Sequence, residues 1–105
     1  MVATRLARLR MVVDPYMLET LMRDLVGHDR APSAYLVYLQ LFRRTHGANA
    51  QTVSIALLDI AEATGLSKRT VQSAVAHLVH RRLITVARER MTSVPEYTVL
   101  RPWRR

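Results

Sequence analysis

The chain has 105 residues, of which half are hydrophobic and 23% are charged, and it contains no cysteine. This composition excludes wholesale disorder, disulfides and cysteine-based zinc or thiol chemistry, and the length suits a single domain. No run reaches the roughly 18 apolar residues of a membrane span, and the N-terminus lacks the features of a secretory signal. We therefore expect a soluble cytoplasmic protein.

Positive charge is concentrated in the C-terminal part of the chain. The formal net charge is +8, and residues 1–62 carry seven basic and six acidic side chains, whereas residues 63–105 carry nine and two. A basic surface provides the sequence-independent part of nucleic-acid affinity. It can equally be a solvated surface without a partner, so charge alone leaves both interpretations open.

Residues 1–13 form a segment that is basic through Arg5, Arg8 and Arg10. We interpret this segment as an N-terminal tail, with a basic arm on a nucleic-acid backbone and a helical lead-in as the alternatives. The folded domain is then expected at residues 14–105.

Two helices are expected within residues 14–46, the first from Pro15 to Gly27 and the second from Pro32. The apolar residues of the second helix cover nearly its whole circumference, so other residues must cover part of them. A tight internal core would do so, and so would a homodimer, the commonest oligomer and one that suits palindromic DNA. The predicted dimer interface contains Tyr16, Leu18, Leu21, Met22, Tyr35, Tyr38 and Phe42.

Residues 56–81 have the pattern of two helices joined by a tight turn, and they follow a short alternating strand at residues 51–55. Gly65 can end the first of these helices in the left-handed conformation, and Ser67 can cap the second. The spacing of Ala61, Gly65, Leu66, Val71 and Ala74 resembles the helix-turn-helix of DNA-binding proteins.

Two segments rich in β-branched residues, 83–87 and 97–100, predict a hairpin with a polar, basic tip. A helix-turn-helix followed by a hairpin resembles a winged helix, similar to the domains of MarR and GntR regulators and of some plasmid replication initiators. The resemblance covers about residues 33–100 and implies a mainly α fold with a small β-hairpin wing at residues 82–100. Beyond the hairpin, Trp103 is expected to fold back onto the end of the sheet.

The helix at residues 68–80 has an apolar side centred on Val71, Val75 and Leu78 and a polar side opposite to it. The resemblance implies that this is the recognition helix of the major groove, and that the wing contacts an adjacent minor groove or its backbone. The predicted DNA-binding residues are Ser67, Lys68, Arg69, Thr70, Gln72, Ser73, His77, Arg88, Arg90 and Thr92.

Other site chemistries find little support in the sequence. His77 and His80 could face one metal ion, but no cysteine or adjacent carboxylate accompanies them. Asp59 and Glu62 lie near each other on a helix, but nothing predicts the pocket that a carboxylate pair needs for catalysis. The chain also lacks a glycine-rich phosphate loop. We therefore expect no enzyme activity, no cofactor and no metal site.

Together these features predict a sequence-specific double-stranded DNA-binding protein, a small dimeric bacterial or phage transcription regulator at the nucleoid. One alternative is a DNA-binding protein of replication initiation or plasmid maintenance. Another is a winged-helix interaction module whose first two helices contact a protein partner. An effector bound at a dimer interface stays open as well.

Overall fold

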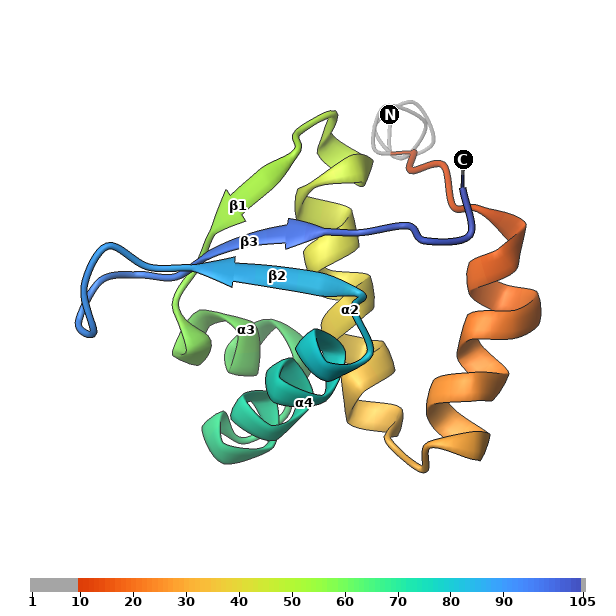
Figure 1. The fold of residues 1–105 in the computed structure, drawn as a ribbon, viewed down its shortest axis with the longest axis horizontal. Coiled ribbons are helices and arrows are strands. Elements are labelled where there is room, and N and C mark those ends of the chain that lie inside the picture. The colour runs from red at the N-terminus through yellow and green to blue at the C-terminus, as the bar shows by residue number, and fades with distance from the viewer. Residues whose placement is uncertain (1–9, 105) are drawn as a thin grey trace, which may run out of the picture.

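The computed structural model describes residues 10–104 and confirms a mainly α fold with a small antiparallel sheet. In Figure 1, α2 lies in the centre, with the helix of residues 15–28 on one side and the sheet, α3 and α4 on the other. The elements after residue 28 are α2 (Pro32–Arg44), η3 (His46–Ala48), β1 (Thr52–Ser54), α3 (Leu57–Thr64), α4 (Lys68–His80), β2 (Ile84–Ala87) and β3 (Glu96–Val99).

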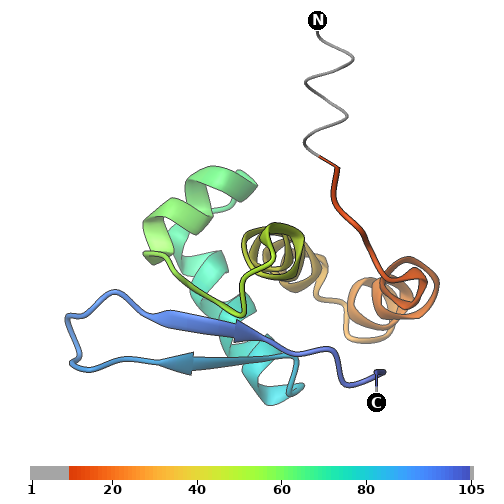
Figure 2. The same cartoon turned by 90° about the horizontal axis from the view of Figure 1, so that it is seen from above.

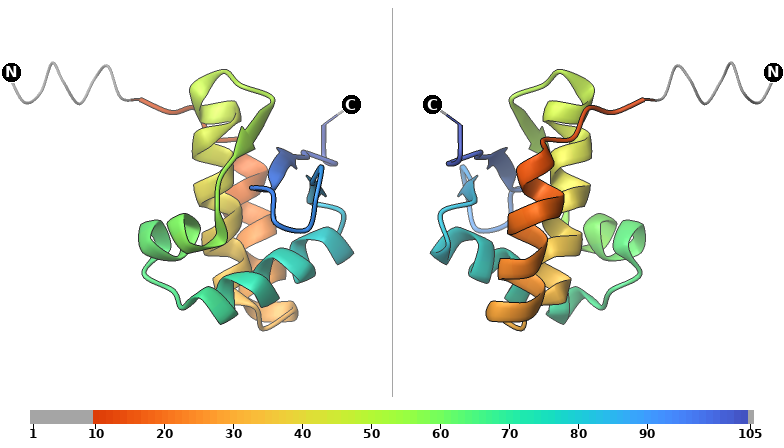
Figure 3. Two further views of the ribbon diagram at one scale, coloured as in Figure 1. Left: turned by 90° about the vertical axis from the view of Figure 1, so that its left-hand side faces the viewer. Right: turned by 90° about the vertical axis from the view of Figure 1, so that its right-hand side faces the viewer.

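The helix at residues 15–28, called the first helix below, is wider than an α-helix. It contains two π-helical segments, η1 (Met17–Leu21) and η2 (Arg23–His28), and the Met22 amide donates to the Met17 carbonyl five residues earlier. The helix starts at Pro15 as predicted, but it continues past Gly27 to His28. The residue with a left-handed conformation after the helix is Arg30, with φ of 54°. The right-hand view of Figure 3 shows the first helix in front of α2.

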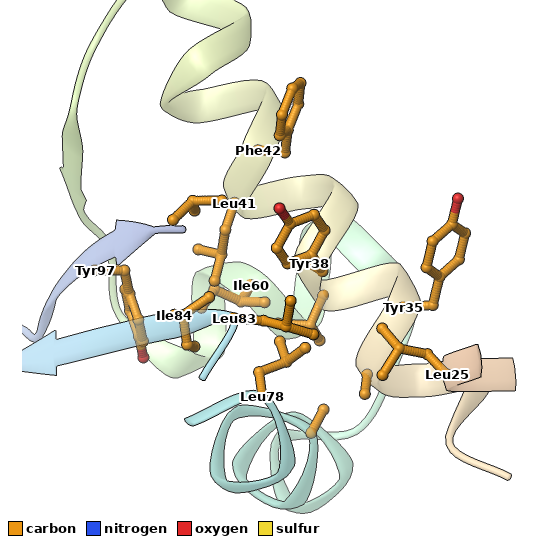
Figure 4. Packing of buried hydrophobic residues seen from close by; sticks show 14 of the residues in the cluster. Leu25, Tyr35, Tyr38, Leu41, Phe42, Ile60, Leu78, Leu83, Ile84 and Tyr97 are labelled. Carbon is orange, nitrogen blue, oxygen red and sulfur yellow. The ribbon is translucent and has the colours of Figure 1, made fainter. Parts of the chain in front are cut away.

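The hydrophobic core is organised around α2. Figure 4 shows its apolar side chains meeting residues of α3, α4 and the sheet, among them Ile60, Leu78 and Tyr97. Two α2 hydroxyls also bind backbone of distant segments: Tyr35 donates to the Met17 carbonyl at 2.7 Å and Tyr38 donates to the Leu100 carbonyl at 2.8 Å. Most of the apolar surface of α2 is therefore covered within the chain.

The sheet has three antiparallel strands in the order β1-β3-β2. The predicted hairpin is present as β2 and β3, and β1 pairs with the other edge of β3. Tyr97 is opposite Val53 on one side and Val86 on the other, and its buried ring fixes the inner face of the sheet. Figure 2 shows that the connection between β2 and β3 extends beyond the rest of the domain, as a wing does.

The C-terminal residues fold back onto the first helix, whereas Trp103 was expected at the end of the sheet. Its ring stacks on Tyr16 with centroids 4.7 Å apart, and its indole Nε1 donates to Asp14 Oδ2 at 2.9 Å. Before the helix, Met11 and Val13 pack against the core, so the domain includes residues assigned to the tail. The remainder of that tail, residues 1–9, lies outside the described residues.

Candidate nucleic-acid interface

The turn between α3 and α4 has the local geometry that the sequence predicts. Gly65 ends α3 with φ of 77°, and its amide donates to the Ala61 carbonyl at 2.9 Å. Ser67 caps α4, because its hydroxyl oxygen accepts from the Thr70 amide at 3.1 Å and its hydroxyl donates to Thr70 Oγ1 at 2.9 Å. Ser67 and Thr70, both predicted to bind DNA, thus define where α4 begins.

The outer side of α4 is polar and positively charged. Val71, Ala74 and Leu78 are buried against the core, and α4 contains no acidic residue. The exposed side chains on the other side include Lys68, Arg69, Gln72 and Ser73. No other element of the described part of the chain covers the outer side of α4 (Figure 3, left). Arginine and glutamine can each make two hydrogen bonds to a base edge.

The wing lies next to the start of the helix-turn-helix. Lys68, Arg88 and Thr92 line one hollow between the beginning of α3 and the wing loop. The loop is turned by hydrogen bonds between Arg90 and Ser93, and Arg88 Nη1 donates to the Met91 carbonyl at 3.2 Å. Arg90 and Thr92 are exposed. The structure thus brings a cation of α4 and a cation of the wing to one surface.

The family model of the helix-turn-helix domain matches residues 31–84, which run from the start of α2 into β2. The chain belongs to this helix-turn-helix domain family. The helices and the small antiparallel hairpin are consistent with a winged helix, and the family supports DNA as a partner. No curated protein and no solved structure gave a significant match.

One predicted contact residue of this helix-turn-helix domain is engaged inside the molecule. His77 Nε2 lies 2.8 Å from Asp29 Oδ2, so its ring faces the junction between the first helix and α2. No local sequence pattern indicates this pair, because 48 residues separate the two side chains. The predicted contact residues of α4 that are exposed, Lys68, Arg69, Gln72 and Ser73, therefore lie in its N-terminal half.

The residues predicted for the dimer interface divide into two groups. Leu21, Tyr35, Tyr38 and Phe42 are buried in the chain's own core. Tyr16, Leu18 and Met22 stay exposed, although Tyr16 also stacks on Trp103. Of the predicted interface residues, only those on the outer surface of the first helix are accessible to a second copy.

None of the helices in residues 10–104 has the length and apolar character needed to cross a bilayer. Within the same residues, no three His, Asp or Glu side chains are grouped so that they could bind a metal ion.

Proposed function

We propose that this chain is a sequence-specific double-stranded DNA-binding protein, a small dimeric transcription regulator of a bacterium or phage that acts in the cytoplasm at the nucleoid. The observation that carries the proposal is that a cation at the start of α4 and a cation of the wing, Lys68 and Arg88, line one hollow. Arg69 lies exposed on the same helix. Membership of the helix-turn-helix family supports the same partner.

The proposed contacts have separate tasks. Arg69, Gln72 and Ser73 contact base edges in the major groove from the exposed side of α4. Lys68 and the cap residues Ser67 and Thr70 contact the phosphate backbone at the start of α4. Arg88, Arg90 and Thr92 contact the neighbouring minor groove or its phosphates from the wing. His77 contributes indirectly, through its bond to Asp29.

The proposed dimer forms through the first helix. Leu18, Met22 and Val26 are 57%, 38% and 40% exposed, and they follow one another at four-residue spacing along its outer surface. Glu19 and Arg23 are exposed beside this stripe. An antiparallel pairing of two such helices around Met22 would cover the stripe and bring Glu19 of each copy near Arg23 of the other. Charge complementarity therefore favours a second copy.

Selection from a library of random duplexes tests the proposal. We expect the protein to enrich an inverted repeat, with half-sites about one helical turn apart, because a two-fold dimer presents two recognition helices. Light scattering on the same preparation should give the mass of two chains. Failure to enrich any sequence would contradict specific binding, and enrichment of a single unrepeated half-site would contradict the dimer.

A further inference from the structure

A buried carboxylate lies where the first helix meets α2. The Asp29 side chain is only 7% exposed, and its Oδ2 lies 2.8 Å from His77 Nε2 and 2.9 Å from Arg81 Nε. Its Oδ1 lies 2.9 Å from His28 Nδ1. We call these four residues the Asp29 cluster. Both oxygens of one carboxylate are thus engaged by donors from two separate parts of the chain.

The cluster joins elements that are far apart in the sequence. Asp29 and His28 belong to the end of the first helix, whereas His77 lies in the last turn of α4 and Arg81 is its C-cap residue. The hydrogen bond from His28 lowers the pKa of Asp29, as do His77 and Arg81, while burial acts in the opposite direction. The carboxylate is therefore ionised at neutral pH, and hydrogen bonds to an ionised acceptor are of the stronger kind.

The backbone around Asp29 is fixed as well. The Asp29 amide donates to the Asp24 carbonyl at 2.8 Å, and the Ala31 amide donates to the Leu25 carbonyl at 2.8 Å. Arg30 between them has φ of 54°, a left-handed conformation that is unfavourable for a residue with a side chain. The carboxylate is thus presented to α4 from a rigid connection and not from a freely moving loop.

Apolar packing holds α4 against the core, and the bonds to Asp29 act in addition to it. The helix contacts the core through Val71, Ala74 and Leu78, and such contacts have little directional preference. Hydrogen bonds with defined donor and acceptor positions restrict rotation of a helix about its axis. At its C-terminal end these bonds are those of His77 and Arg81 with Asp29.

We propose that Asp29 is a positioning residue for DNA recognition, which binds His77 and Arg81 and thereby sets the angle at which the exposed side of α4 enters the major groove. The inference rests on the proposed function. Asp29 does not touch DNA in this proposal. Because it directly follows the first helix, it also links the orientation of α4 to the surface through which two copies would pair.

The test compares specific with non-specific affinity in the Asp29→Asn variant. Wild type and variant are titrated with the duplex selected by the wild type and with a random-sequence duplex of equal length. We expect the ratio of the two affinities to fall about tenfold in the variant, with unchanged or higher affinity for random sequence, because phosphate contacts tolerate a rotated helix and base contacts do not. Asp24→Asn removes the same charge from the same helix and should leave the ratio unchanged.

Two further variants separate positioning from folding. Arg81→Gln leaves the carboxylate bound to His77 and should lower the ratio less than Asp29→Asn does, and it serves as the probe if Asp29→Asn fails to fold. In the double variant, Arg81→Gln should add little to the effect of Asp29→Asn, since both break the same link. An unchanged ratio in Asp29→Asn, whether or not both affinities fall, would overturn the inference and leave the proposed function intact. A wild type that does not discriminate between the duplexes would contradict both.

Discussion

The outer side of α4 and the outer side of the first helix are both exposed, but they have opposite chemistry. Lys68 and Arg69 lie on a helix that contains no acidic residue, whereas the first helix exposes Leu18, Met22 and Val26. Contacts of cations with phosphates weaken as salt rises, and apolar contacts hardly respond to it. The proposed DNA surface and the proposed dimer surface therefore differ in chemistry, and separate substitutions can disrupt each of them.

Removing Arg69 should have the largest effect on the α4 surface. Arg69→Ala is expected to reduce affinity for the selected duplex by roughly tenfold to a hundredfold, because one bidentate contact to a base is worth about 1–3 kcal/mol. Fluorescence anisotropy measures the change. Arg43→Ala is the matched control, since Arg43 is an exposed arginine near the end of α2 and its Nη1 donates to the Gly47 carbonyl. Equal losses in the two variants would mean that only net charge matters.

A charge in the apolar stripe should disrupt the proposed dimer surface. Met22→Glu is expected to raise the dimer dissociation constant at least about tenfold, because the two new carboxylates would face and repel each other across the two-fold axis and the apolar contact would be lost. Sedimentation measures the mass, and the variant should still bind a single half-site. Val12→Glu adds the same charge at an exposed apolar residue before the helix. A Met22→Glu variant that stays dimeric would exclude the stripe as the interface.

The attachment of the first helix to α2 can be weakened without touching α4. Tyr35→Phe removes the hydroxyl that donates to the Met17 carbonyl at 2.7 Å, and it should lower the free energy of unfolding by about 1 kcal/mol. Tyr97→Phe should be neutral or slightly stabilising, because the Tyr97 hydroxyl is buried and has no hydrogen-bond partner among the described residues. Urea unfolding measures both variants. A larger loss of unfolding free energy for Tyr97→Phe than for Tyr35→Phe would contradict the assignment of the Tyr35 hydroxyl as the bonded one and the Tyr97 hydroxyl as the unbonded one.

The contact between the first helix and α4 should depend weakly on acid pH. The pKa of Asp29 in the folded chain lies below its ordinary value of 3.8, chiefly because of the hydrogen bond from His28. Its stabilising contribution is therefore present above that ordinary value and is lost as pH falls through the folded pKa. The difference in unfolding free energy between wild type and Asp29→Asn should shrink as pH falls below the ordinary value of 3.8 and through the folded pKa of Asp29. A difference that grows in acid would contradict the lowered pKa.

The helix-turn-helix was predicted closely because its signals are local. Ser67 caps the helix that starts at the next residue, and Gly65 has the positive φ that its position suggested. Leu66 in the turn and Val71 and Ala74 on α4 pack toward the core, at the offsets that the pattern predicts. The hairpin was equally accessible from its two runs of β-branched residues. Each of these signals acts within a few residues of the structure that it determines.

The features that the sequence did not predict depend on contacts between residues far apart in the chain. The sequence pattern predicted a strand near residue 53 but could not show that it pairs with β3, and it predicted an ordinary first helix without π-helical turns. Trp103 was expected at the end of the sheet, but its bond to Asp14 joins residues 89 positions apart. His77 was assigned to DNA because its helix face looked exposed, whereas Asp29 engages it in the fold. Periodicity identifies which side chains share a helix face and leaves their tertiary partners undetermined.

The central claim is that α4 and the wing bind DNA through their cations, and a salt-dependent titration tests it most directly. Wild type and Lys68→Ala should be titrated with a random-sequence duplex at about 50 mM and about 200 mM salt. We expect wild-type affinity to fall at least about tenfold between the two concentrations, and the variant to bind more weakly with a smaller salt dependence, because Lys68 is the proposed phosphate contact. Absence of binding at the lower salt concentration, or an affinity that changes neither with salt nor on removal of Lys68, would contradict the claim.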